Sequence, residues 1–371
     1  MILELHLIQN FAPSNLNRSD TGSPKDCIFG GVRRARISSQ CFKRAMRTYF
    51  REKFERPADL AERSTRLFEH ISAKLQEKGH SPQESRSTAE GIFLCIDLKA
   101  SSKDKDKTQY LVFMGRDEID RIAAVADENF DLLKDGKPND ATKKTIKKLL
   151  MDILDEGKAA DLGLFGRMLA NLPDRNRDAA SQVAHAISTH KVGLDFDFFT
   201  AVDDLKPDDT AGSDHLGTVE FNSACFYRYA NVNVDKLREN LQNDEDLTRA
   251  TVAAYIRAAV EALPTGKQNS FATHEKPSLV YAVVRDSGMM SLANAFEKPV
   301  FDPKGGVVDE SIKRLVTHYG NVTGVYGDNA ASRIFTTTGD AENANALGDN
   351  ARSFDTLVDR TMSALFNGKE A

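Results

Sequence analysis

The chain of 371 residues is long enough for one large domain or two ordinary ones, with a globular balance of 40% hydrophobic and 28% charged residues. No stretch approaches the roughly 20 continuous apolar residues of a membrane span, which argues against a membrane protein. The four cysteines are scattered, so they predict neither a disulfide framework nor a zinc site. Because this usage fits a reducing compartment, we expect a cytoplasmic protein.

The first predicted strand covers residues 2–8, where apolar residues alternate with Glu4 and His6 as in a half-buried strand. The segment lacks the basic head and cleavage site of a secretory signal, so we interpret it as part of the fold. A long loop rich in Ser, Asn, Asp, Gly and Pro follows over residues 12–32. Long ordered loops are usually functional, which makes this one a candidate binding element.

Positive charge is concentrated between Asn17 and Phe54. This segment holds ten Lys or Arg and three Asp or Glu, a local net charge of +7. Since the formal net charge of the whole chain is -5, the remaining residues carry -12. A basic island in an acidic chain indicates one anionic ligand held at one place.

Residues 34–37 predict a second strand inside this island. Ala35 and Ile37 would face the core, while Arg34 and Arg36 would lie on the opposite side. The two arginines would therefore add to the surface that meets the anion.

An amphipathic helix is predicted next, with Ser38 or Ser39 as its N-cap. Its apolar stripe consists of Phe42, Ala45, Met46, Tyr49 and Phe50. Its polar stripe consists of Gln40, Lys43, Arg44, Arg47 and Arg51. A solvated charged face is the ordinary reading of such a stripe, but here the charge has one sign and lacks acidic i,i+4 partners. Because the helix N-terminus also offers N–H groups to an anion, we expect nucleic-acid phosphates to bind here.

The rest of the chain alternates helical and strand patterns. Residues 55–190 are charge-rich and mostly helical in pattern, and residues 193–220 predict a long hairpin. The elements predicted after the hairpin are a strand at 223–234, a helix at 246–263, a strand at 278–285, a helix at 308–319, a strand at 333–337 and a helix at 353–366. This order predicts an α+β fold, an antiparallel sheet with helices interrupted by two insertions, and a split βαβ, RNA-recognition-type core is the natural candidate.

Motifs for catalysis or metal binding are weak. Gly30-Gly31 is not followed by the Lys-Ser/Thr of a P-loop, so nucleotide hydrolysis is not expected. The histidines and cysteines show no ligand spacing, and we expect no metal and no cofactor.

Aromatic residues in two places are candidates for base contacts. Phe198 and Phe199 place one ring on each face of the predicted hairpin, so one ring could pack on a neighbouring subunit or between bases. For Phe198, packing in the core is an equal alternative. Tyr227 and Tyr229, on the following strand, are weaker candidates for base stacking.

A series of motifs resembles the CasC family, the backbone subunit of the type I-E CRISPR Cascade complex. These motifs are PSNLNRSD (13–20), KDCIFGG (25–31), RRARISSQCFKRAMR (33–47), AHAISTH (184–190), FFTAVDDL (198–205), HLGTVEFNSACFYRYANVNV (215–234) and SLANAFEK (291–298). The resemblance is strong over about residues 1–50 and 180–300 and loose elsewhere.

The resemblance implies a fold shaped like a right hand. Its palm would be a modified RNA-recognition-motif (ferredoxin-like) domain formed by residues 1–54 and 223–371. Residues 55–180 would form a helical fingers insertion, and residues 181–222 a β-hairpin thumb with its approach.

The resemblance also implies a role in antiviral defence. Copies of the protein would stack head to tail along a CRISPR RNA (crRNA) as a helical filament, and would support segmented pairing of the guide with target DNA. The ribonucleoprotein complex would include the other Cascade subunits, namely the large, small, handle-capping and RNA-processing subunits. The protein itself would not be an enzyme. The rival interpretation is an RNA-processing endoribonuclease with an RNA-recognition-type fold, in which Asp20 or Asp26 would act, although no partner base or metal cluster accompanies either residue.

Site residues follow from the resemblance position by position. The RNA-contacting loop and helix of the family correspond to Arg18, Lys25, Ser38, Gln40, Lys43 and Arg47. The residue of the fingers that wedges against the bases corresponds to Met168, and the contacts of the thumb correspond to Phe198, Phe199, Thr200 and Val202. The basic island adds Arg34, Arg36 and Arg44 to the predicted RNA-binding residues.

Two points stay open. Family members have Trp-Phe where this chain has Phe198-Phe199, and the chain contains no Trp, so a smaller ring would make the thumb contact. Arg33, Arg34 and Arg36 could serve either the RNA or the acidic face of the next subunit.

Overall fold

The computed structural model describes residues 1–201, 215–301 and 306–367, which fold into two compact units. The first unit contains residues 1–49, 182–233 and 252–371, and the second contains residues 50–181 and 234–251. Residues 234–251, which the predicted boundaries assign to the palm, belong to the second unit. None of the described helices is long and apolar enough to cross a membrane.

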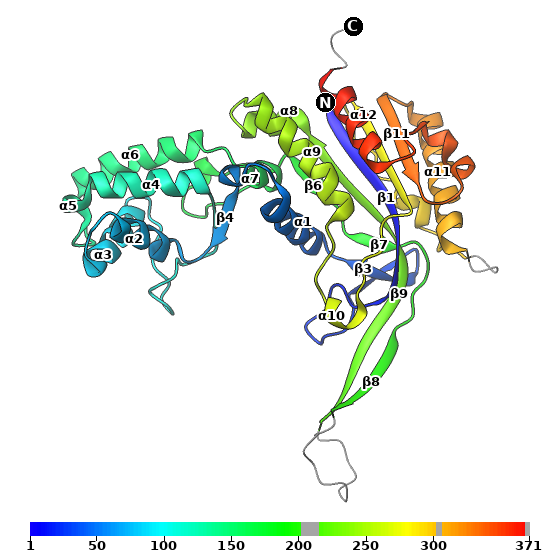
Figure 1. Ribbon diagram of the computed structural model, residues 1–371, viewed down its shortest axis with the longest axis horizontal. Coiled ribbons are helices and arrows are strands. Elements are labelled where there is room, and N and C mark those ends of the chain that lie inside the picture. Colours follow the sequence, from blue (N-terminus) through cyan, green and yellow to red (C-terminus); the bar gives the residue numbers. More distant parts are fainter. Residues whose placement is uncertain (202–214, 302–305, 368–371) are drawn as a thin grey trace, which may run out of the picture. The chain divides into compact units, whose positions relative to one another are not determined.

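A large mixed sheet forms the first unit (Figure 1). Its strands are β1 (Ile2–Ser14), β2 (Asp26–Phe29), β3 (Val32–Ile37), β6 (Ser181–Val183), β7 (Ala186–Ser188), β8 (Asp195–Ala201), β9 (His215–Asn233), β10 (Leu279–Arg285), β11 (Ala330–Thr337) and β12 (Asp349–Asn350). The order along the sheet is β12-β11-β10-β1-β9-β7-β3-β2, and β6 and β8 both pair with β9. The predicted α+β class is confirmed, and the short parallel pair β11–β12 makes the sheet mixed.

Helices cover this sheet. They are α9 (Glu245–Glu261), of which residues 252–261 belong to this unit, α10 (Gln268–Phe271), α11 (Val307–Tyr326) and α12 (Phe354–Phe366), with the 3-10 turns η3 (Ala293–Phe296) and η4 (Ala341–Leu347). Apolar residues of α11, such as Leu315, join a buried cluster with Tyr281 of β10 and Phe335 of β11. This burial of a helix stripe on strand residues is what holds the layer together.

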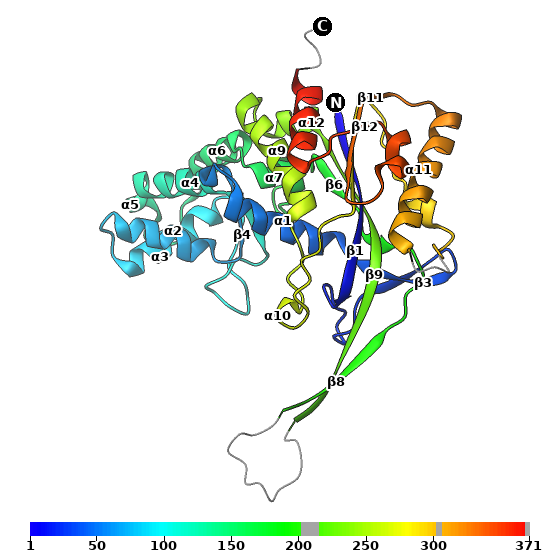
Figure 2. The ribbon, with the colours of Figure 1, turned by 45° about the vertical axis from the view of Figure 1, so that its right-hand side comes forward.

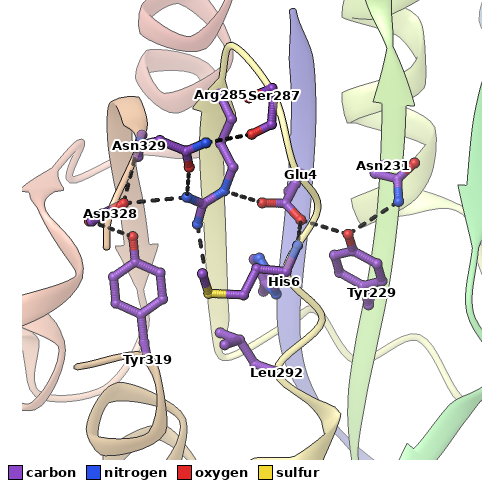
Figure 3. Close-up of polar contacts among 12 residues, drawn as sticks. Glu4, His6, Tyr229, Asn231, Arg285, Ser287, Leu292, Tyr319, Asp328 and Asn329 are labelled. Carbon is purple, nitrogen blue, oxygen red and sulfur yellow. Dashed lines mark hydrogen bonds and ion pairs between the residues drawn. The ribbon is translucent and has the colours of Figure 1, made fainter. Parts of the chain in front are cut away.

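Strand β1 is buried on both faces, which corrects the prediction of a half-buried strand. Glu4 and His6 are 0% and 1% exposed because β1 lies in the sheet interior, between β9 and β10. The carboxylate of Glu4 accepts hydrogen bonds from Arg285 Nε at 2.5 Å, from the Tyr229 hydroxyl at 2.6 Å and from the Met290 N–H at 2.6 Å (Figure 3). A buried carboxylate with three donors, one of them a cation, is compensated for the water it has lost.

The predicted hairpin is present and is formed by β8 and β9. Asp195 pairs with Phe221 and Ala201 with His215, and β9 then pairs with β1 from Asn222 to Asn233, with one register shift between Phe11 and Ser14 of β1. One 19-residue strand therefore belongs to both the hairpin and the central sheet. Both views show the hairpin extending well beyond the sheet (Figures 1 and 2).

The second unit is mostly helical, as the pattern over residues 55–190 predicts. Its helices are α2 (Leu67–Glu77), α3 (Pro82–Leu94), α4 (Arg116–Glu128), α5 (Phe130–Leu133), α6 (Asp140–Glu156), α7 (Ala160–Phe165) and α8 (Val234–Asn240), with the 3-10 turns η1 (Pro57–Asp59) and η2 (Pro173–Arg175). A two-stranded sheet of β4 (Ala61–Ser64) and β5 (Val112–Gly115) was not predicted. A buried ion pair between Arg167 and Glu118, at 2.8 Å, adds to the apolar core.

Candidate nucleic-acid interface

Helix α1 (Ser39–Lys53) presents the predicted polar stripe. The Ser38 hydroxyl accepts a hydrogen bond from the Cys41 N–H at 3.3 Å, which confirms Ser38 as the N-cap. The Ser38 N–H donates to Asn17 Oδ1 at 2.8 Å, so the helix start is tied to the preceding loop. Phe42 and Met46 are buried, as the apolar stripe predicts.

The polar stripe of α1 is open to solvent to different degrees. Gln40 and Arg44 are exposed, while Lys43 and Arg47 are half-buried. Burial lowers the pKa of Lys43 from its ordinary value, and a cation that is partly desolvated interacts more strongly with a phosphate that reaches it.

The loop before β2 is shorter than the predicted loop over residues 12–32. Strand β1 extends to Ser14 and β2 begins at Asp26, so the loop covers residues 15–25. Its ends are joined by the hydrogen bond from the Lys25 N–H to the Asn17 carbonyl at 2.8 Å, and Arg18 bridges to Pro24. Arg18 is exposed and Lys25 is half-buried. The loop is therefore held in shape before any ligand binds.

The prediction that Arg34 contacts RNA is wrong. Its side chain is 0% exposed, and its guanidinium group donates to five backbone carbonyls. The acceptors are Phe29, Ser188, Thr189, Phe296 and Glu297, at 2.7 to 3.2 Å. Strand β3 lies between β2 and β7, and the segments at 188–189 and 296–297 cover this side of the strand at Arg34.

Arg36, unlike Arg34, is partly open to solvent on β3. It is half-buried, and its Nε donates to the Asp26 carbonyl at 3.1 Å. Its Nη1 lies 3.2 Å from Nδ1 of His185, whose pKa is lowered by burial and by the charges of Arg36 and Lys25. Two cations and a histidine with a lowered pKa thus lie close together. His185 was not predicted, although it lies in the motif AHAISTH.

A hollow of about 650 Å³ opens beside α1 in the first unit. Its walls are the loop at 16–22, the flank of α1 and residues 264–266, and its lining comprises Leu16, Asn17, Arg18, Ser19, Asp20, Gly22, Cys41, Arg44, Ala45, Thr48, Pro264, Thr265 and Gly266. A Cβ atom at Gly266 would lie 2.3 Å from the Leu16 carbonyl oxygen, so only glycine allows this approach. Sequence reasoning missed residues 264–266, because their role depends on this distant contact.

The hairpin carries exposed aromatic rings. Phe198 is 65% exposed and Phe199 is 42% exposed, and the Phe199 ring covers Gly217, its cross-strand partner. Thr200 is exposed, and Val202 lies outside the described residues.

Tyr227 and Tyr229 are not stacking platforms. They are 2% and 8% exposed. Both hydroxyls take part in buried hydrogen bonds, with the Leu292 N–H at 2.9 Å and with Glu4 at 2.6 Å. The weaker of the two aromatic predictions is therefore wrong.

The second unit has its own exposed candidates. Met168, between α7 and η2, is 78% exposed. Four exposed lysines lie along α6, at Lys143, Lys144, Lys147 and Lys148, and in the described part of the chain only Lys147 forms an ion pair, a long one of 3.8 Å with Asp97. Sequence reasoning did not single out this surface, although the spacing KKTIKK was readable.

Comparisons place the chain among known proteins. A family model described as CT1975-like protein matches residues 3–360. A chain of a CRISPR RNA-guided surveillance complex, described as pre-nicking, has 34% sequence identity and a TM-score of 0.89, with 99% of this chain and 100% of that chain covered. A chain of another CRISPR RNA-guided surveillance complex has 29% identity and a TM-score of 0.77, with 98% and 100% covered. No curated protein matches this chain.

Proposed function

The chain belongs to the CT1975-like protein family, and from this premise we propose that it is the CRISPR RNA-binding backbone subunit of a Cascade surveillance complex of type I-E, of the CasC kind. In this proposal the first unit is a modified RNA-recognition palm, the helical second unit forms the fingers, and the β8–β9 hairpin is the thumb. The protein acts in the cytoplasm, in antiviral defence.

One observation carries the proposal: Arg18 of the loop at 17–25 and Arg44 of α1 line the same hollow, and Asn17 of that loop is hydrogen-bonded to the start of α1. Arg18 and Arg44 are exposed and form no ion pair within the residues that the structure describes. Such a surface attracts a polyanion and grips it through phosphates, without reading its sequence. Since a guide RNA differs from spacer to spacer, this is the mode of binding that a backbone subunit requires.

The predicted residues then divide by role. Phosphate contacts fall to Arg18, Lys25, Arg36, Gln40, Lys43, Arg44 and Arg47. The Ser38 hydroxyl is engaged as the N-cap, so its part is to hold the start of α1 toward the RNA. Phe198, Phe199 and Thr200, together with Val202, contact the guide from the thumb, and Met168 wedges against its bases from the fingers. Exposed rings and an exposed thioether suit this task because base stacking is tolerant of sequence.

Target DNA and the protein partners complete the proposal. The lysines of α6 are a second polyanion surface, which we assign to target DNA paired with the guide. Copies of the chain stack head to tail, a heterologous contact that forms open arrays and can pair acidic with basic patches. The large, small, handle-capping and RNA-processing subunits bind to this array.

Assembly on RNA tests the proposal. Purified protein should bind single-stranded RNA at low salt in a number of copies that grows with RNA length, as native mass spectrometry can count. Lys43→Ala should weaken binding equally for any RNA sequence and flatten the log-log salt slope by roughly 0.7. A loss that depends on sequence would mean base readout, and a wild-type protein that stays monomeric with RNA would overturn the proposal.

The same preparation separates this role from the endoribonuclease. We propose that the chain binds RNA without cutting it. Incubated with Mg²⁺ and RNA complementary to the guide, the assembled protein should leave that RNA intact. Cleavage at fixed sites that disappears in Asp20→Ala would establish the rival function instead.

A further inference from the structure

The hollow beside α1 borders the polar stripe that faces the RNA phosphates and shares Arg44 with it. Cys41, Arg44, Ala45 and Thr48 line it from α1, and they follow the i, i+3, i+4, i+7 spacing of one helix flank. Lys43 is absent from this lining. The hollow therefore lies next to the path proposed for the RNA backbone, and its volume of about 650 Å³ leaves room for part of a nucleotide.

The charges in the hollow do not suit a simple phosphate site. Arg18 and Arg44 line it, but so does the carboxylate of Asp20. In the described ranges none of these three side chains forms an ion pair, so Asp20 is not there to neutralise an arginine. A carboxylate repels a phosphate, and its place in a polyanion site calls for a ligand group that donates a hydrogen bond.

On a sugar-phosphate backbone that donor is the 2′-hydroxyl of ribose, which DNA lacks. Building on the proposed function, in which α1 binds RNA, we infer that the hollow is a ribose-reading subsite that makes the protein prefer RNA over single-stranded DNA. Arg18 and Arg44 hold the phosphate at its mouth, and Asp20 accepts the hydrogen bond of the 2′-hydroxyl. Phosphate contacts, which RNA and DNA both offer, provide affinity. The contact with the 2′-hydroxyl makes the protein bind RNA more tightly than DNA.

The walls of the hollow are rigid before RNA arrives. The Ser19 N–H donates to the Ser23 carbonyl at 2.8 Å and the Gly22 N–H to the Ser19 carbonyl at 3.2 Å, which fixes the turn that carries Asp20. Asn15 Nδ2 donates to the Gly22 carbonyl at 2.9 Å and to the Glu220 carbonyl at 2.8 Å, which ties the turn to β9. A carboxylate on a fixed turn loses little conformational entropy when it binds the ligand. A single hydrogen bond can therefore contribute measurably to the preference for RNA over DNA.

Matched oligonucleotides test the subsite. Affinities for oligouridine and oligodeoxyuridine of equal length, measured by fluorescence anisotropy, differ only by the 2′-hydroxyl. Wild-type protein should bind the RNA about tenfold more tightly, the scale of one hydrogen bond to a charged acceptor. Asp20→Ala should weaken RNA binding roughly tenfold yet leave DNA binding unchanged or tighter, because a negative charge has been removed. Thr48→Trp, which fills the hollow, should also reduce the preference for RNA.

Lys43→Ala is the matched control, since a lost phosphate contact should weaken both ligands alike. The inference is overturned if Asp20→Ala strengthens binding to RNA and DNA equally, because the carboxylate would then act only by repulsion. It is also overturned if the effect of Asp20→Ala differs between oligouridine and oligoadenosine, which would indicate a base contact. A wild-type protein that binds neither ligand would instead contradict the proposed function, so the two failures are distinguishable.

Discussion

Arg34 illustrates what a sequence pattern reveals at the scale of one residue and what it conceals. Alternation along 34–37 correctly predicts that Ala35 and Ile37 are buried. It fails for Arg34, because its acceptors at Ser188, Thr189, Phe296 and Glu297 come from segments more than 150 residues away. No local spacing encodes five carbonyls that converge on one guanidinium group. Arg34 therefore contacts neither RNA nor a neighbouring subunit, and its role is to bind backbone carbonyls inside the fold.

Removing Arg34 should destabilise the protein. In Arg34→Met several buried carbonyls lose their donor, and we expect a loss of about 3 kcal/mol in the free energy of unfolding, the cost of buried groups left unsatisfied. Urea denaturation followed by circular dichroism measures it. The control is Arg33→Met, where the side chain is 51% exposed and forms an ion pair with Asp26, so the change should stay within about 0.5 kcal/mol. Equal stabilities of the two variants would contradict the internal role of Arg34.

At the scale of elements, α1 was predictable because a helix of this length shows a regular spacing of apolar and polar residues in the sequence. Its cap at Ser38, its buried stripe and its polar stripe all follow from residues a few positions apart. The hairpin was predictable for the same reason. The hollow beside α1 was not, because residues 264–266 reach it only through a close approach to Leu16 that the fold creates.

The exposed ring of Phe198 should matter for RNA and not for stability. It is 65% exposed, so Phe198→Ala should change the free energy of unfolding by no more than about 0.5 kcal/mol. The same variant should weaken assembly on RNA by roughly 1 to 3 kcal/mol, the range for one lost base–aromatic contact. Thermal unfolding and RNA titration measure the two effects separately. Tyr281→Ala, which removes a fully buried ring from the sheet, is the opposite control, with a large loss of stability. Unchanged RNA binding in Phe198→Ala would remove this ring from the interface.

At the scale of the whole molecule, the chain passes between the two units four times, after residues 49, 181, 233 and 251. Two of these passages fall inside helices, α1 and α9, where no linker composition marks a boundary. The predicted boundaries at 54 and 223 were therefore placed at changes of pattern, and residues 234–251 could not be assigned from composition. The buried polar network around Glu4 was also beyond prediction, because its members come from β1, β9, β10 and the segment at 328–329 (Figure 3).

This network predicts how stability depends on pH. Burial, with the nearby charge of Arg285, lowers the pKa of His6 to about 3 from 6.5. Below pH 6.5 the unfolded chain therefore takes up a proton at His6 that the folded protein excludes. Stability is fully present above pH 6.5 and declines as pH falls toward 3, by about 1.4 kcal/mol per pH unit from this group. Urea denaturation between about pH 6 and pH 4.5 should show a shallower decline in His6→Gln than in wild type. His274→Gln, at an exposed histidine, should keep the wild-type slope, and identical slopes in all three proteins would contradict the prediction.

The continuous strand β9 limits how this protein can change over evolutionary time. Its pairing extends from His215 at the hairpin to Asn233 in the sheet, and the register shifts once along β1, between Phe11 and Ser14. A single-residue insertion in the hairpin half would turn every ring beyond it to the opposite face, whereas a pair of residues matched on β8 would preserve all of them. Hairpins of this family should therefore be free to lengthen or shorten in steps of two, and an odd insertion should survive only with a bulge that absorbs it.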